Sequence, residues 1–274
     1  MFTRRVQSHI LWYPVLIIVS LIMISPLFWM VITAIKPSGA VLNFRAPILP
    51  THPEWGNILA VWKMAPFGRF FLNSIIFSVA ATAGQVITSQ MAGYAFARVD
   101  FPGKNILFYC VLSGLMIPFT VVMVPVIQIV HAFGWINTFW GLIIPNIASA
   151  FGAFLYRQFF FTVPGALGEA AKVDGASLLR IFVQIYLPLA KPMTAALTVL
   201  SFLANWNNFL FPLLVTNTTK MMVLPLGLSM FQNQHTVEYN FLMAATLIVV
   251  VPIFIVSLFT QRYIIDGLSM GAVK

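Results

Sequence analysis

Long apolar runs alternate with short polar segments along the chain, and six of the runs are long enough to cross a lipid bilayer. They cover residues 10–35, 70–97, 106–130, 138–161, 193–215 and 241–263. A membrane-spanning helix needs about 20 apolar residues, whereas a tilted barrel strand needs only about half that number. The pattern therefore predicts an all-α membrane protein with six transmembrane helices.

Prolines lie inside most of these runs, and each removes a backbone donor and can kink its helix. Such kinks suit a bundle that opens and closes, but proline is also simply common in membrane helices. The sequence leaves these two interpretations open. The prolines are Pro14, Pro26, Pro118, Pro125, Pro145, Pro212 and Pro252.

The composition agrees with a bilayer as the solvent. Of 274 residues, 60% are hydrophobic and 8% are charged, whereas a soluble domain carries roughly a quarter charged residues. The net charge of +9 does not indicate a nucleic-acid surface, because the Lys and Arg residues lie between apolar runs rather than on one face. Cys110 is expected to be a small buried residue, and the four histidines lack metal-ligand spacing, so no metal site is predicted.

The positions of the basic residues predict the orientation. With the N-terminus inside, ten of the 15 Lys and Arg residues fall inside and five outside, which favours an N-in/C-in topology. This topology places one long loop, residues 162–191, in the cytoplasm, and two long segments, residues 37–68 and 216–240, outside. The inside residues are Arg4, Arg5, Arg98, Lys104, Arg157, Lys172, Arg180, Lys191, Arg262 and Lys274.

The cytoplasmic loop predicts two short helices that meet at a glycine. Pro164 suits the first turn of a helix, and Gly175 can end that helix in the left-handed conformation. Ser177 can then cap a second helix, which Pro188 is expected to end. The first helix carries two alanines between charged residues, and such small residues allow it to lie deep in a groove of another protein.

The loop is similar to the EAA loop of binding-protein-dependent ABC importer permeases. The fixed positions of that motif are matched by Glu169, Ala170, Ala171, Gly175, Ile185, Leu187 and Pro188. The resemblance implies that residues 162–190 form a cytoplasmic coupling loop whose first helix inserts into a cleft of the ATPase subunit. The implied coupling residues are Glu169, Ala170, Ala171, Asp174, Gly175, Leu187 and Pro188.

Further segments resemble the sugar importer permeases for oligosaccharides, maltose-like sugars and glycerol phosphate. They include Asn73-Ser74, Gly93 to Arg98, Phe101-Pro102-Gly103, Trp140-Gly141-Leu142 and Gly267-Leu268. The resemblance implies a single permease domain over residues 1–274, with the type I ABC importer fold, in the bacterial plasma (inner) membrane. It also implies four kinds of contact: a second homologous permease subunit, two ATP-binding-cassette subunits, an extracytoplasmic solute-binding protein and the lipid bilayer. The tail from Asp266 to Lys274 is expected to touch the ATPase.

The chain lacks the sequence of a phosphate loop. Its single Gly-Lys pair, Gly103-Lys104, is followed by Asn105, whereas a Walker A motif needs Ser or Thr there. The chain is therefore not expected to be an enzyme or to hold a cofactor, and ATP and Mg²⁺ are expected on partner subunits. Residues 267–271 match the Gly-x-Ser-x-Gly nucleophile elbow around Ser269, but that motif needs a preceding strand, which disfavours a hydrolase.

Two groups of polar residues within the spans are candidates for the translocation path. The second span carries Gln85 on a polar stripe, for which ordinary helix packing is the favoured explanation. The fifth span carries an aromatic residue beside amides, which suits a sugar site as well as it suits packing. The candidates are Gln85, Asn205, Trp206, Asn207 and Asn208.

The carboxylates argue against a transporter that works alone. Each of the six Asp and Glu residues falls in a predicted loop or tail, whereas proton- and sodium-coupled carriers usually place a carboxylate within the membrane. A stand-alone secondary transporter or channel stays the alternative to an importer permease that forms half of a translocation pathway.

Overall fold

The computed structural model describes the backbone of residues 2–43, 45–231 and 238–269, and the side chains of residues 12–43, 45–231 and 238–258. Helices are the only regular elements in this part of the chain. The chain divides into two compact units. The first unit joins Met1–Gly68 to Gly227–Pro252, and the second, here the central unit, joins Arg69–Leu226 to Ile253–Lys274.

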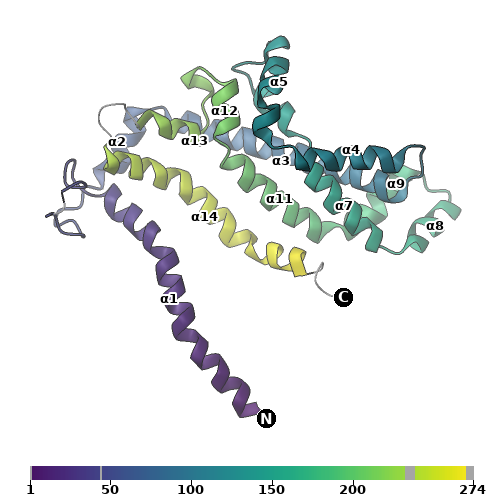
Figure 1. Ribbon diagram of the computed structural model, residues 1–274, viewed down its shortest axis with the longest axis horizontal. Helices are drawn as coiled ribbons and strands as arrows, with labels where there is room; N and C mark the ends of the chain where they lie inside the picture. Colours follow the sequence, from purple (N-terminus) through teal and green to yellow (C-terminus); the bar gives the residue numbers. More distant parts are fainter. Residues whose placement is uncertain (1, 44, 232–237, 270–274) are drawn as a thin grey trace. The chain divides into compact units, whose positions relative to one another are not determined.

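The helices are consistent with the six predicted spans. Four stretches are long and apolar enough to cross a bilayer, and two bent helix pairs bring the number to six if each pair is one span. The four stretches lie in α1 (Phe2–Ala34), in α3 (Phe67–Arg98), in α6 (Phe139–Ile143) to α7 (Ala150–Thr162) through the short η1 (Ile144–Asn146), and in α14 (Tyr239–Ser269). Figure 1 shows α1 and α14 as long single helices.

The third predicted span is broken rather than straight. It consists of α4 (Lys104–Met116) and α5 (Phe119–Ala132), which are bent by 105°. The break falls at Ile117, whose backbone is extended, and Pro118. Proline disfavours the helical conformation in the residue before it, so α4 ends there.

The fifth predicted span is also divided. α11 (Lys191–Trp206) stops nine residues before the end of the apolar run at Val215, and α12 (Leu210–Val215) covers the remainder. The Asn208 side-chain oxygen accepts a hydrogen bond of 3.2 Å from the Phe211 amide. Because such a bond satisfies a free N–H group in the first turn of a helix, Asn208 favours a new helix start there.

The segment after α12 is fixed to the rest of the central unit at two points. Near its start, the Asn137 side-chain oxygen accepts hydrogen bonds from the amides of Asn217 (2.8 Å) and Thr218 (3.1 Å). Further along, beyond η3 (Thr219–Met221), the Asn73 amide group donates to the carbonyl of Met222 at 2.8 Å. The chain continues through α13 (Leu224–Gly227) and η4 (Leu228–Phe231).

In the first unit, the loop after α1 is held by asparagine side chains. Asn57, in α2 (Gly56–Met64), donates to the carbonyls of Ala34 (2.9 Å) and Lys36 (3.0 Å). These are carbonyls at and just beyond the end of α1, which have no partner within the helix. Asn240 likewise donates to Ser38 at 3.1 Å.

The interior of the central unit lies where α3, α7 and α11 pack together. A buried polar group joins the three helices: Gln90 donates to Tyr156 (3.1 Å) and to Thr194 (3.0 Å), and Tyr156 donates to Thr194 (2.8 Å). Gly93 allows α3 and α7 to approach closely, because a Cβ atom there would lie 2.4 Å from Tyr156 Cβ. The polar stripe on α3 faces this packing, with Ser74, Ser78, Thr82, Ser89 and Gly93 all buried.

Candidate functional site

The loop between α7 and α11 contains the two short helices that the sequence predicts. The first is α8 (Gly165–Val173), preceded by Pro164. Gly175 has φ +80°, and the amide of Ala176 donates to the carbonyl of Ala171 at 2.9 Å. This pairing is the usual way in which a left-handed glycine ends a helix, so the prediction for Gly175 is confirmed.

The second helix is longer and less regular than predicted. Ser177 accepts a hydrogen bond from the Arg180 amide at 3.3 Å and caps α9 (Leu178–Ile181), as predicted. The helix then widens into a π-turn, η2 (Phe182–Tyr186), and continues as α10 (Leu187–Leu189). Pro188 has no N–H group to donate four residues back, which favours the wider turn before it. The helix ends one residue later and bends by 78° into α11.

The predicted coupling residues lie on two faces of α8 and its turn. Glu169, Ala170 and Asp174 are exposed, and Val173 beside them exposes 88% of its surface. Ala171 instead packs against the hydrophobic cluster that contains Phe160. The two alanines therefore do not form a single docking face: one points outward and the other holds α8 on the central unit. Leu187 is half-buried and packs against the same cluster, and Pro188 is exposed.

The last turn of α3 holds the base of this loop, which the sequence analysis did not predict. Arg98 Nε donates to the carbonyl of Phe160 at 3.1 Å, and Arg98 also bonds the carbonyl of Val163. Both carbonyls lie at the C-terminal end of α7, where that of Phe160 also accepts from the Val163 amide at 3.3 Å. One turn earlier, the Tyr94 hydroxyl donates to the carbonyl of Leu178 at 3.4 Å, where the second helix begins.

Aromatic rings surround the same contact. The Tyr94 ring lies 4.9 Å from that of Phe182 and 5.1 Å from that of Tyr186, measured between centroids. The Arg98 guanidinium lies 5.4 Å from the centroid of the Tyr186 ring. A polar cavity of about 160 Å³ remains beneath α8, and Glu169 and Lys172 also line it.

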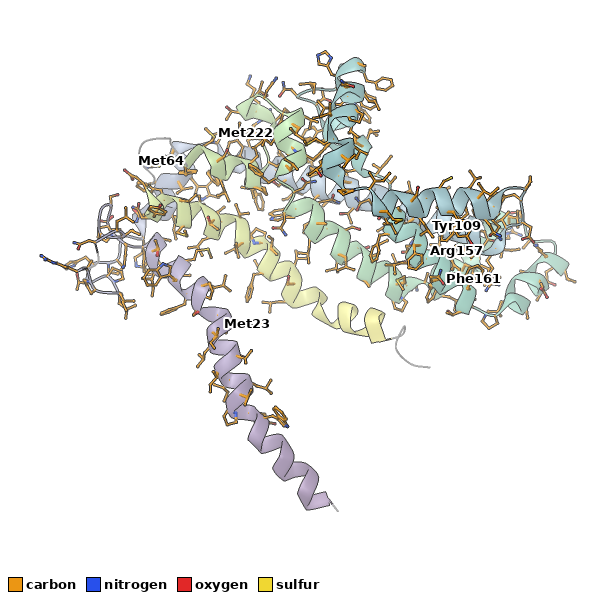
Figure 2. All side chains as sticks on the ribbon, in the orientation of Figure 1. Met23, Met64, Tyr109, Arg157, Phe161 and Met222 are labelled. Atoms are coloured by element: carbon orange, nitrogen blue, oxygen red, sulfur yellow. The ribbon has the colours of Figure 1, made fainter. Side chains whose placement is uncertain are left out.

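A second arginine joins α7 to its neighbours at a separate place. The Arg157 guanidinium lies 3.8 Å from the ring centroid of Phe108 and 4.7 Å from that of Phe161, and its Nε donates to the carbonyl of Phe96 at 3.3 Å. Figure 2 labels Arg157 and Phe161. Cation–π contacts of this kind stabilise a charge that is partly removed from water.

The structure brings together some of the predicted path residues. Asn205 donates to Thr82 (3.1 Å) and to Gln85 (3.4 Å), so it joins α11 to the polar stripe of α3. Trp206 is buried, and its ring meets that of Phe71 edge-on at 6.0 Å. These contacts are those of helix packing, and they leave the indole face and the Asn205 amide turned into the protein.

The other two amides lie apart from this group. Asn207 is exposed and donates to the carbonyl of Leu203 in its own helix at 2.9 Å. Asn208 is half-buried and caps α12, as described above. Of the four adjacent residues, Asn207 is the one whose side chain is open to a solute.

Other candidate chemistry receives no support from the structure. Ser269 is the last residue of α14, so a helix precedes it rather than the strand that a nucleophile elbow requires. In the part of the chain with described side chains, no three His, Cys, Asp or Glu residues gather as metal ligands. Cys110 is exposed rather than buried, so the prediction of a buried cysteine is wrong for this structure. The tail from Asp266 to Lys274 lies outside the described side chains.

Comparison with known proteins gives a match over most of the chain. Residues 89–269 match the family model described as binding-protein-dependent transport system inner membrane component. The permease protein AraQ of an arabinooligosaccharides transport system in Halalkalibacterium halodurans is 34% identical, over 93% of each chain. The permease protein UgpE of an sn-glycerol-3-phosphate transport system in Yersinia enterocolitica is 34% identical, over 98% of each chain.

Two solved structures have a similar fold. A chain of a bacterial ABC transporter that imports the acidic polysaccharide alginate matches with a TM-score of 0.80, at 22% identity, over 95% of this chain and 97% of that one. A chain of a bacterial alginate ABC transporter in complex with a pentasaccharide-bound periplasmic protein matches with a TM-score of 0.68, at 16% identity, over 95% and 94%.

Proposed function

The chain belongs to the family of binding-protein-dependent transport system inner membrane components, and we propose that it is the permease subunit of an ATP-driven importer for a sugar or sugar-derived solute. The family makes it a multi-pass membrane transport protein, and its helices agree with that role. The observation that carries the proposal is the match of relatives over nearly the whole chain, together with an exposed α8 at the position of the resembling loop.

The solute class is inferred from the relatives. Their names give arabinooligosaccharides and sn-glycerol-3-phosphate, and the similar structures belong to alginate importers. These solutes share hydroxyl-rich carbon chains, which amide side chains recognise by hydrogen bonds. Asn207 is the path candidate best placed for this. The other candidates would act by fixing the helices around the path, and they are Gln85, Asn205, Trp206 and Asn208.

The coupling role is proposed for the outward face of α8. Glu169, Ala170, Val173 and Asp174 form an exposed apolar and acidic surface on a short helix, which fits insertion into a groove of an ATPase subunit. ATP and Mg²⁺ would be bound by that partner, and this chain would contribute the docking helix and the spans.

The assembly follows from the family. We place this chain beside a second homologous permease and two ATPase subunits, with an extracytoplasmic binding protein that delivers the solute. The chain would then form half of the pathway in a bacterial inner membrane, with both termini inside. One of the similar structures is itself in complex with a periplasmic protein.

Purification and uptake test this function together. The chain is expected to purify with ATPase subunits, and proteoliposomes of the complex with its binding protein should accumulate radiolabelled arabinotriose or sn-glycerol 3-phosphate only with ATP inside. Purification without any ATPase subunit, combined with uptake that survives ATP depletion, would instead support a stand-alone secondary transporter.

A labelling experiment tests the orientation. In a Cys110→Ser background, Leu179→Cys should react with a membrane-impermeant maleimide in inside-out vesicles and stay unlabelled in intact spheroplasts, because Leu179 is exposed and lies outside the proposed docking residues. A cysteine at Thr219 should show the opposite pattern, because it lies in the segment expected outside. The reverse result at both positions would overturn the N-in/C-in topology.

A further inference from the structure

The segment from Val163 to Ser177 is here called the α8 segment. The last turn of α3 contacts the chain at both ends of it, although the two are distant in sequence. Arg98 binds the chain where it leaves α7, through the carbonyls of Phe160 and Val163. Tyr94 binds it where the second helix starts, through the carbonyl of Leu178. The two residues, here the α3 pair, are four apart and therefore lie on one face of the helix.

These contacts differ in strength from ordinary loop contacts. A charged guanidinium that binds carbonyls at a helix end forms charge-assisted hydrogen bonds, and it also opposes the partial negative charge of that end. The Tyr94 ring adds packing on Phe160, Phe182 and Tyr186, of which all three are buried. α8 itself contributes little to this attachment, because most of its residues are exposed.

We propose that the α3 pair makes α3 and the α8 segment one mechanical unit, so that a displacement of α8 is delivered to α3 rather than absorbed by the loop. This rests on the proposed function, in which α8 is the segment that a partner displaces. The pair acts by position: neither residue needs to touch a partner or a solute. The remaining attachment of the segment from Val163 to Ser177 is the apolar packing of Val163, Ala171 and Ala176 on the cluster that contains Phe160.

The path of the displacement follows from contacts already described. α3 carries Thr82 and Gln85, which bind Asn205 of α11. It also carries Gln90, which binds Tyr156 of α7 and Thr194 of α11. A shift of α3 along its axis would therefore carry α7 and α11 with it, since both are bound to it by buried polar groups.

Distance measurements between two spin labels test the proposal. In the Cys110→Ser background, labels are placed at Leu167 on α8, outside the four residues proposed to dock, and at Met91 on α3, both exposed positions, in the chain purified with its partner subunits. In the otherwise unchanged protein, the distance distribution should be the same without nucleotide and after trapping with ATP, Mg²⁺ and vanadate. A distribution that shifts between the two states would overturn the proposal by itself.

Variants of the α3 pair supply the second arm. Arg98→Ala should broaden the distribution or make it depend on nucleotide, and Arg98→Lys should have a smaller effect because one donor can still reach a carbonyl. Tyr94→Phe, which keeps the ring, should broaden it less than Arg98→Ala. If all three variants match the unchanged protein, the pair does not join α8 to α3.

Arg157→Ala is the matched control, because Arg157 also binds a carbonyl of α3 from α7 but does not contact the α8 segment. It should leave the Leu167–Met91 distribution unchanged, and a change as large as that of Arg98→Ala would overturn the specific role of Arg98. The variants should still co-purify with the ATPase subunits. The solute transported per ATP hydrolysed should fall by about fivefold or more. If no ATPase subunit co-purifies even with the unchanged chain, the proposed function fails, and the variant arm still tests the pair in the isolated chain.

Discussion

Asn205 Nδ2 lies 3.1 Å from Thr82 Oγ1, so the amide of a candidate solute residue is bound to the neighbouring helix. This contact predicts that Asn205 contributes mainly to the stability of the bundle. Asn205→Ala should lower the free energy of unfolding by about 1 kcal/mol, the usual range for a polar contact between membrane helices. Thermal unfolding of the detergent-solubilised protein measures this.

Asn207 offers the matched control for this prediction. Its side chain is exposed and bonds only within its own helix among the described contacts. Asn207→Ala should leave the unfolding temperature unchanged but lower the uptake of the transported solute. Equal loss of stability in the two variants would contradict the distinction between a packing amide and a path amide.

The turn after α8 depends on a left-handed backbone at Gly175, where φ is +80°. Gly175→Val places a β-branched residue in that conformation, which costs at least about 1–2 kcal/mol and should change how α8 ends. We expect the variant to insert and to bind its ATPase weakly, with ATP-dependent uptake largely lost. Gly175→Asn, which tolerates this conformation, should keep most of the uptake, and loss of uptake in both would point to another role for Gly175.

Glu169 lies on the exposed face of α8 that is proposed to dock. Glu169→Lys should leave membrane insertion unchanged, but the side chain also lines the cavity beside Arg98. Glu169→Gln, which removes the charge without adding a cation there, is therefore the control for stability. ATP-dependent uptake should fall in Glu169→Lys, because the docking surface of α8 would then present a positive charge, in place of a negative one, to the ATPase groove. Normal uptake in Glu169→Lys would remove Glu169 from the coupling surface.

The close approach of α3 and α7 at Gly93 predicts a strong effect of one methyl group. Gly93→Ala would place its Cβ 2.4 Å from Tyr156 Cβ and 2.9 Å from the Arg157 amide nitrogen. Because backbone atoms cannot yield easily, we expect the variant to lose about 1–3 kcal/mol of stability. Gly114→Ala is the control, since its Cβ would meet only Ala150, at 4.0 Å, and thermal unfolding should separate the two variants by several degrees.

Asn137 holds the start of the segment after α12 by accepting hydrogen bonds from Asn217 and Thr218. Its own φ is +58°, so Asn137→Gly removes these bonds without straining the backbone. This variant should be cut faster by an added protease between residues 216 and 231. Asn137→Asp keeps the accepting oxygen but loses the amide donor that binds the Asn217 side-chain oxygen, so it should protect the segment partly, and cleavage at the rate of the glycine variant would contradict this.

Apolar length predicted an all-helical chain with several spans, of which the described residues contain four to six, but it did not predict where they break. Pro14, Pro26 and Pro125 lie inside continuous helices, whereas the chain turns at Pro118. A proline therefore does not decide a break by itself. The bend at Pro118 goes with contacts of α4 with α7 and of α5 with α12, which lie far away in the sequence and which apolar length does not predict.

The loop was predictable because its signals are local. A left-handed glycine and a serine cap act on neighbouring residues, so Gly175 and Ser177 could be assigned from the sequence. Arg98 and Tyr94 could not, because they bind backbone carbonyls, and a carbonyl has no sequence signature. The spacing of four between a tyrosine and an arginine at the end of α3 was the available signal.

The bend between α4 and α5 lies in a stretch that can insert into the membrane before its packing partners are made. Residues 106–130 form one uninterrupted apolar stretch, so the machinery that inserts nascent chains receives a single hydrophobic segment. The helices that α4 and α5 contact, α7 and α12, are synthesised after this segment. The segment can therefore enter the membrane on its apolar length alone, and these contacts can form only once the later helices are present.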